Sequence, residues 1–261
     1  MLADKRVRLA LLAGVIGWII MGVLVIATDG LTAPMWIVFV LTSWLQIGAL
    51  FYRRRPTGPL ADAQSLFMQG KFDEAAALLE TMPRESESVQ AKTLLGNTYR
   101  QLGRLKESET VLRKALMTSG TDNAFPLYGL GRTLLAGGDF PGAAQTIREA
   151  LESGGRKVIS ADLALAYYLS GDESAAAAEA KSVAGMLQIE AYRVLMVNYL
   201  LHTVAEDPRA LDVMRRSSEG LEFWKSEARR FADTDYGNRL AQEIETMERL
   251  LASGSEENGN L

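Results

Sequence analysis

The stretch LLGNTYRQLGRLKESETVLRKAL, residues 94–116, decides how this chain folds. Its apolar residues recur every three or four positions on both sides of Gly103, a pattern typical of two amphipathic helices joined by a tight turn. Variants of the stretch follow Gly70, Gly138 and Gly171, and the four glycines lie 33, 35 and 33 residues apart by the difference of their numbers. A fixed period of this size predicts stacked helical hairpins, because one hairpin cannot bury its apolar face alone.

Small and large residues keep fixed places around these glycines, so that helices can pack closely. In residues 94–116 these small and large residues are Leu95, Gly96, Tyr99, Gly103, Leu112 and Ala115. At these positions the stretch, like YGLGRTLLAGGDFPGAAQTIREAL at residues 128–151, resembles a tetratricopeptide repeat (TPR). The resemblance implies an all-α fold, with an α-solenoid of about four to five TPR-like hairpins over residues 59–217. The first helix of each pair would line a concave surface that binds peptides or helices.

The first 55 residues have a different character. Residues 9–27 and 34–52 contain no charge, and each run is about long enough for a helix to cross a bilayer. Basic residues flank the pair and are absent from the turn between them; they are Lys5, Arg6, Arg8, Arg53, Arg54 and Arg55. This asymmetry predicts a transmembrane helical hairpin over residues 1–55 in a bacterial-type plasma membrane, with the N-terminus and the repeats in the cytoplasm. A cleaved signal peptide is the alternative interpretation of the first run.

Two further apolar stripes follow the repeats. Leu221, Trp224, Ala228 and Phe231 form one, and a second runs from Tyr236 to Leu251. Residues 218–252 are therefore expected to form helices that cap the solenoid, whose last repeat would otherwise expose an apolar face. The polar tail over residues 253–261 is expected to be disordered.

The composition argues against several functions. The chain has 28 Lys and Arg against 32 Asp and Glu, and six of the bases flank the predicted spans, so the remainder is acidic and unsuited to nucleic acid. It has no cysteine, which excludes disulfides and thiol catalysis, and its single histidine, His202, is interpreted as a packing residue. No nucleophile with a base at plausible spacing is found, so the sequence predicts no enzyme activity, no cofactor, no metal site and no small-molecule substrate.

The family's concave positions can be carried onto this chain by register. They are Gln90, Thr93, Asn97, Arg100, Gln101, Phe125, Tyr128, Arg132, Leu165 and Tyr168. Because guanidinium and amide groups donate several hydrogen bonds in a fixed geometry, Asn97, Arg100 and Arg132 favour an acidic or carboxylate-bearing partner. However, Thr93 stands where carboxylate-binding members carry lysine, and a solvated helix face with ordinary arginines is the alternative interpretation.

These features together favour a membrane-anchored TPR adaptor that recruits a protein partner to the cytoplasmic face of the membrane. An accessory subunit or assembly factor of a larger membrane complex is the alternative, in which the hairpin packs specifically through small pairs such as Ala10 and Gly14. An enzyme with a site in the C-terminal helices is a third hypothesis, the least favoured of the three.

Overall fold

The computed structural model describes residues 58–83, 88–119 and 123–253, together with Trp18, Val40, Leu41, Ser43 and Trp44. It divides the chain into two units, residues 1–57 and 58–261. Apart from those five residues, the predicted spans lie outside the described part of the chain, as do residues 254–261 of the predicted tail. Among the described residues, no helix has the length and apolar character needed to cross a bilayer.

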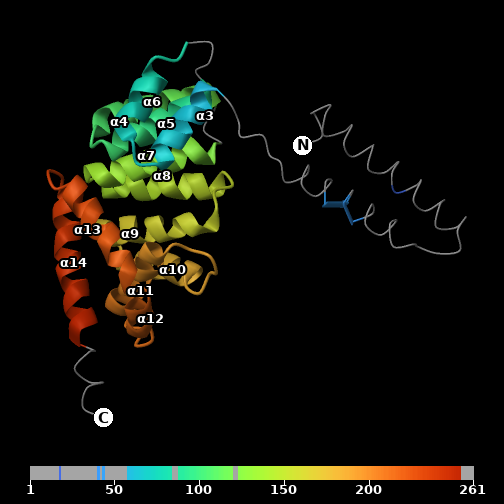
Figure 1. The fold of residues 1–261 in the computed structure, drawn as a ribbon. Helices are drawn as coiled ribbons and strands as arrows, with labels where there is room; N and C mark the ends of the chain where they lie inside the picture. Colours follow the sequence, from blue (N-terminus) through green and yellow to red (C-terminus); the bar gives the residue numbers. More distant parts are fainter. Residues whose placement is uncertain are drawn as a thin grey trace, which may run out of the picture. The chain divides into compact units, whose positions relative to one another are not determined.

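The second unit is an α-helical solenoid, which confirms the all-α, TPR-like fold predicted from the sequence. Residues 58–83, 88–119 and 123–253 contain twelve α-helices and no strand. The helices are α3 (Pro59–Met68), α4 (Phe72–Glu80), α5 (Val89–Gln101), α6 (Leu105–Ser119), α7 (Ala124–Gly137), α8 (Phe140–Glu152), α9 (Ser160–Ser170), α10 (Glu173–Val183), α11 (Ala191–Ala205), α12 (Ala210–Arg216), α13 (Leu221–Arg230) and α14 (Asp235–Ser253). From α3 to α12 they stack as antiparallel pairs (Figure 1).

The recurring glycines make the turn inside each of the first four pairs. Gly70, Gly103, Gly138 and Gly171 have φ angles of 75°, 76°, 89° and 87°, in the left-handed region that costs other residues a Cβ clash. At Gly138 and Gly171 this conformation directly ends the first helix of the pair. An aspartate then caps the second helix: Asp139 accepts a hydrogen bond from the Gly142 amide at 3.0 Å. The period of the sequence is therefore the period of these turns.

Small residues inside the pairs let the two helices touch. A Cβ added to Gly131 on α7 would lie 2.5 Å from Cγ1 of Ile147 on α8, and one added to Gly96 on α5 would lie 2.5 Å from Cγ of Leu112 on α6. Ile147 and Leu112 are fully buried. Each large side chain fills the space that the facing glycine leaves, as the sequence pattern predicts.

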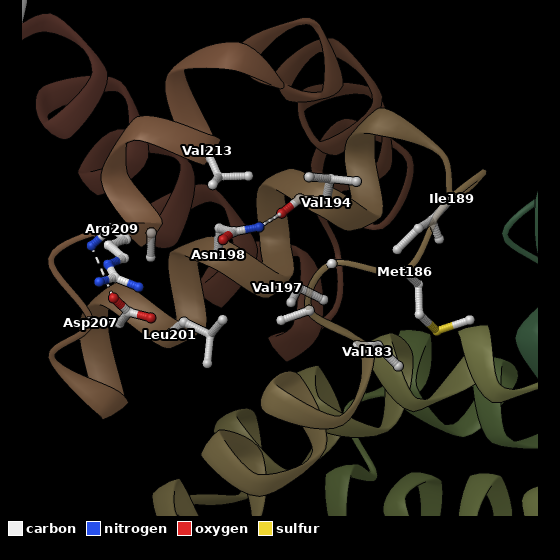
Figure 2. Close-up of a pocket in the computed structure, with 13 residues that line it drawn as sticks. Val183, Met186, Ile189, Val194, Val197, Asn198, Leu201, Asp207, Arg209 and Val213 are labelled. Atoms are coloured by element: carbon white, nitrogen blue, oxygen red, sulfur yellow. Dashed lines mark hydrogen bonds between the residues drawn. The ribbon is translucent and has the colours of Figure 1, made fainter.

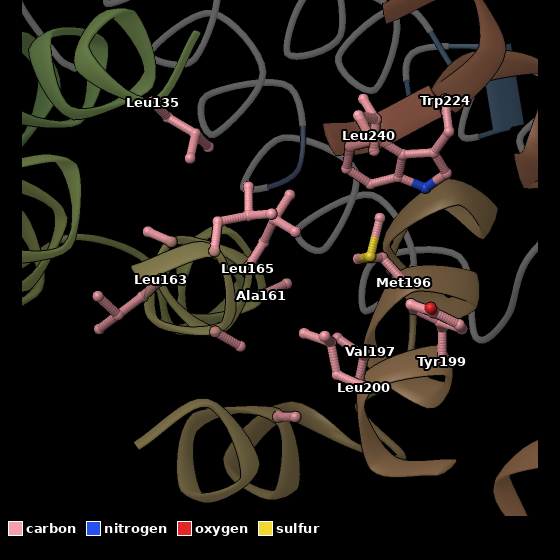
Figure 3. Close-up of a cluster of buried hydrophobic side chains, with 14 of the residues drawn as sticks. Leu135, Ala161, Leu163, Leu165, Met196, Val197, Tyr199, Leu200, Trp224 and Leu240 are labelled. Carbon is pink, nitrogen blue, oxygen red and sulfur yellow. The ribbon is translucent and has the colours of Figure 1, made fainter. Parts of the chain in front are cut away.

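The main core extends from α7 to α14 and includes the C-terminal helices. Figure 3 shows Trp224 of α13 and Leu240 of α14 among side chains of α9 and α11 such as Leu165 and Met196. A smaller cluster, built on Ala63, Leu79 and Ala91, lies between the first two pairs. The last two helices are thus part of the same core as the third, fourth and fifth pairs.

The C-terminal helices contact more of the solenoid than its last pair. Helix α14 contacts α7 as well as α12, and Figure 1 shows it running across the stacked pairs. The polar contacts of α13 and α14 reach α5, α7, α9 and α11, which are the first helices of their pairs. These helices line the concave surface, so α13 and α14 cover much of the surface on which the partner-binding residues were expected.

Two glycines of α7 provide a test of this packing. Gly131→Ala should reduce the free energy of unfolding by about 1–3 kcal/mol, because the new methyl group overlaps Ile147. Gly137→Ala is the matched control in the same helix, since its methyl group would meet Leu105 Cδ1 only at 4.0 Å. It should leave stability unchanged or raise it by about 0.5 kcal/mol. Urea unfolding of the full chain in detergent, followed by circular dichroism, measures both, and equal effects would contradict the packing.

Candidate functional site

The predicted groove residue Arg132 is buried beneath α13. Its Nη1 donates to Oδ1 of Asp162 at 2.8 Å, and its Nη2 donates to Oε1 of Glu227 at 3.1 Å. Glu227 is itself 2% exposed and accepts a second hydrogen bond from Arg230 at 2.9 Å. Burial lowers the pKa of Arg132, but the nearby carboxylates of Asp162 and Glu227 outweigh this effect and raise the pKa above its usual value. A residue expected to meet a partner therefore binds two carboxylates of its own chain.

Asp162 of α9 is the centre of this cluster. It accepts a hydrogen bond from the Tyr128 hydroxyl at 2.8 Å and contacts Arg132 on one side and Arg193 of α11, at 3.3 Å, on the other. Arg193 also donates to Glu190 at 2.6 Å. Burial raises the pKa of the Asp162 carboxyl, but the two guanidinium groups outweigh it and lower the pKa below the usual value. The carboxylate thus holds α7, α9 and α11 together.

A second set of contacts holds α14 in the groove. The hydroxyl of Tyr168 on α9 donates to the Glu243 carboxylate at 3.1 Å, and the hydroxyl of Tyr199 on α11 donates to the same group. Arg239 donates to the carbonyl of Leu169. Tyr168 was predicted to contact a partner, and α14 occupies that place instead.

Displacing the C-terminal helices would cost more than a partner segment usually gains. Six large apolar side chains of this region are at least 94% buried: Trp224, Phe231, Tyr236, Leu240, Ile244 and Met247. At about 1.5–3 kcal/mol each, their burial is worth on the order of 10 kcal/mol or more. A ligand of micromolar affinity gains about 8 kcal/mol in total. The covered part of the groove is therefore a structural interface, and its residues are committed to the fold.

The N-terminal part of the groove is open. A pocket of about 280 Å³ lies between α5 and the start of α7, and none of its lining residues comes from α13 or α14. The lining residues are Val89, Gln90, Thr93, Leu94, Asn97, Asn123, Phe125 and Pro126. They include four of the predicted groove residues. Thr93 bonds to the Val89 carbonyl of its own helix, whereas Phe125 is 79% exposed, a large apolar surface for one side chain.

The remaining predicted residues lie elsewhere. Leu165 is buried in the main core and does not line a groove. Gln101, the last residue of α5, is half-buried and lines none of the pockets described here. Arg100 is 7% exposed, in the last turn of α5, at the edge of the Arg132 cluster.

A larger cavity lies on another part of the array. It has a volume of about 490 Å³ and is enclosed by the end of α10, one face of α11 and the short helix α12 (Figure 2). Most of its lining is apolar, including Val183, Val197 and Leu201. The amide of Asn198 donates to the Val194 carbonyl at 2.8 Å. Such a lining offers few groups for directional recognition.

Sequence reasoning missed the groups that fill the groove, namely Asp162, Arg193, Glu227 and Glu243. One signal was present for the first two: each is a charge within a helix of mostly apolar and aromatic residues, where only a paired charge is stable. Glu227 and Glu243 gave no such signal, because they lie on amphipathic helices with several other acidic residues.

Comparison with known proteins agrees with the repeat geometry. The tetratricopeptide repeat model matches residues 60–124 and 128–186. These two segments are thus similar to tetratricopeptide repeats. The comparison with curated proteins gave no match.

Several solved structures are similar to the chain. A MamA structure (MSR-1, C2) has 19% identity and a TM-score of 0.48, covering 63% of this chain and 95% of that one. A second MamA structure has 16% identity and a TM-score of 0.42, covering 75% and 92%. The putative kinesin light chain of Podosopora anserina, with nearly identical TPR-like repeats, has 15% identity and a TM-score of 0.41, covering 73% and 93%.

The role of Asp162 can be tested by Asp162→Asn. Removing the carboxylate leaves Arg132 and Arg193 buried with one fewer negative partner, so the free energy of unfolding should fall by about 3–5 kcal/mol at pH 7. Because the folded-state pKa is lowered, the stabilisation is fully present above the unfolded value of about 3.9 and is lost as the pH falls through the lower folded value. The difference in the free energy of unfolding between the native protein and the variant should therefore become smaller below about pH 4.

Urea unfolding across this pH range measures the effect. Glu109→Gln is the matched control, because Glu109 makes an exposed ion pair with Arg113 at 2.8 Å. Its loss should cost less than about 1 kcal/mol. Equal effects of the two substitutions at pH 7 would show that Asp162 does not hold the cluster.

Proposed function

We propose that this chain is a membrane-anchored scaffold that recruits a protein partner through the open part of its groove. Tetratricopeptide repeats bind proteins, and residues 60–124 include α5, which supplies most of the lining of the open pocket. One observation carries the proposal: α13 and α14 cover the groove residues of the later repeats, but leave Gln90, Asn97 and Phe125 beside an open pocket.

The open part offers both kinds of contact that a partner segment needs. The exposed ring of Phe125, with Val89 and Leu94, supplies apolar surface, and the amides of Gln90 and Asn97 supply hydrogen-bonding groups. No catalysis is required of such a site. Recruitment alone raises the concentration of the partner near its targets.

The anchor in this proposal is the hairpin predicted from residues 1–55. It would place the repeats on the cytoplasmic side of a bacterial-type plasma membrane, since the bases flank both ends of the hairpin and are absent from its turn. Two spans that fix the scaffold at the bilayer confine its partner to a thin layer beside the membrane, where a weak interaction is effective.

The groove is tested by photo-crosslinking in cells that produce the full chain. A photoreactive phenylalanine analogue at position 125 should yield a crosslinked protein adduct, because Phe125 is 79% exposed beside the pocket. Asn97→Ala should lower the yield of that adduct about tenfold, the effect expected from losing one or two hydrogen bonds.

The matched control places the same analogue at Met117, which is 86% exposed on α6 and lines none of the pockets described here. That position should not yield the adduct. An adduct of the same size and yield from both positions, or one from position 125 that Asn97→Ala leaves unchanged, would refute recruitment through this pocket.

The anchor is tested by cysteine labelling, which is simple here because the chain has no cysteine. Asp29→Cys, in the predicted turn, should react with a membrane-impermeant maleimide added to intact cells. Met117→Cys, on the exposed surface of the repeats, should react only after the membrane is permeabilised. Labelling of Met117→Cys in intact cells would place the repeats on the opposite side and refute the proposed orientation.

A further inference from the structure

The cavity beside the fifth helical pair has no part in the proposed recruitment. Its volume is about 490 Å³, and its walls come from the end of α10, one face of α11 and the short helix α12 (Figure 2). Protein interiors contain few voids larger than a water molecule, and an empty apolar cavity destabilises a fold because its walls lose packing contacts. A space of this size is within the range of small-molecule sites.

The cavity lies on a face of α11 that the C-terminal helices leave free. Val194, Val197 and Leu201 line it, and their spacing of three and four residues places them on one side of the helix. Tyr199, which donates to Glu243 of α14, does not line it. The cavity shares no lining residue with the open pocket of the groove. It is therefore a separate site.

The body of the cavity resembles hydrocarbon. Most of its lining is valine, leucine, isoleucine, methionine and alanine, and Val183, Val197 and Leu201 are buried. The amide of Asn198, a polar group in this lining, donates to the Val194 carbonyl of its own helix at 2.8 Å. A peptide backbone placed here would bury N–H and C=O groups with few partners, which is costly. A hydrocarbon chain has no such groups, so it suits these walls better than a peptide segment does.

The charged residues of the lining lie together at one end of the cavity. Figure 2 shows Asp207 and Arg209 at that end, and Met186 and Ile189 at the other. Asp207 accepts a hydrogen bond from the backbone amide of Arg209 at 2.9 Å. The Arg209 side chain is exposed, and its guanidinium group makes no ion pair with any other residue that the structure describes. Its donors are therefore available to an anionic group at the mouth of the cavity.

The volume matches a single hydrocarbon chain. An apolar cavity of about 150 Å³ takes a benzene molecule, which has six heavy atoms, so a bound apolar ligand needs roughly 25 Å³ per heavy atom. At that density, a cavity of about 490 Å³ holds roughly 20 heavy atoms. A chain of about 12–16 carbons with its head group at the mouth fits this limit, whereas a lipid with two such chains exceeds it.

We infer that this cavity binds a long-chain fatty acid, with the carboxylate at Arg209 and the end of the hydrocarbon chain toward Met186. The apolar walls supply the affinity for the chain, and the single charged end sets its direction. The inference goes beyond the proposed recruitment and does not depend on it, because the site and the open groove have no residue in common.

The site is tested by photolabelling in membranes from cells that produce the full chain. The probe is a palmitic acid analogue with a diazirine group in its chain, and mass spectrometry of the digested protein locates the label. The native chain should be labelled within residues 194–213, on α11 and α12. Val213→Trp, which places a large side chain in the cavity, should lower the yield of this label about tenfold.

Val204→Trp is the matched control, because Val204 is a half-buried valine of α11 that does not line the cavity. It should keep the full labelling, as should Asn97→Ala in the open pocket. Circular dichroism checks that each variant is folded. The inference would be overturned by a label that Val213→Trp leaves unchanged, or by equal labelling of exposed apolar residues elsewhere, such as Met68 and Met117.

The position of the carboxylate is tested by comparing the acid probe with its methyl ester. The native chain should be labelled about fivefold more by the acid, and Arg209→Gln should reduce labelling by the acid to the level of the ester. Arg216→Gln is the matched control, since Arg216 is an exposed arginine of α12 that does not line the cavity. Equal labelling of the native chain by acid and ester would overturn the assignment to a free fatty acid and indicate the acyl chain of an ester.

A preference for the acid that Arg209→Gln retains would overturn the role of Arg209. Because this variant changes only an exposed side chain, it tests the site even if Val213→Trp does not fold.

Discussion

The ion pair between Arg132 and Glu227 is the interaction on which the arrangement of this protein depends. It joins side chains 95 positions apart, on α7 and α13, and both are nearly inaccessible to water. Neither charge can be left alone in such a place without losing several kcal/mol. Arg132 also requires Asp162 on α9. The stacking of the middle repeats and the docking of the C-terminal helix are therefore coupled, and neither would be stable in this form without the other.

This coupling divides the groove into two parts with different roles. In the later repeats, the polar side chains of the concave face are satisfied by Glu227 and Glu243, and apolar residues of α13 and α14 complete the core. In the second repeat and at the start of the third, the pocket that contains Asn97 and Phe125 has no such cover. Within the described residues, the groove that the repeat pattern predicts to be continuous is thus covered by α13 and α14 in the later repeats and left uncovered by them at its N-terminal end.

The sequence predicts the repeat and its turns because each depends on local chemistry. A glycine is favoured where φ is positive, as at Gly138, and a small residue is required where a helix meets Ile147. The apolar stripes of α13 and α14 likewise predict that both helices bury a face. They do not predict which surface covers that face, because the end of the solenoid and its concave side both contain apolar residues that could pack against it. That choice depends on contacts such as Arg132 with Glu227, which local patterns do not contain. For the same reason, the sequence predicted partner contacts for Arg132 and Tyr168, whereas in the structure they contact α13 and α14 of the same chain.

Charged groups also explain why the C-terminal helices adopt one register. Apolar stripes alone would allow α13 and α14 to slide along the concave face by a helical turn at little cost, since one set of large side chains can replace another. A guanidinium group accepts a carboxylate only in a narrow geometry, and Glu227 opposite α7 and Glu243 opposite α9 and α11 fix two points of the register. Compared with an apolar core of equal volume, the cluster adds little to the stability of the folded state, but it specifies one arrangement. Arg100 lies at the end of this pattern and forms a longer ion pair with Glu227, at 3.9 Å, in which Nε and Nη1 make no hydrogen bond. The boundary between the covered and the open groove therefore lies at the last of these ion pairs, where the charged contacts that fix α13 end.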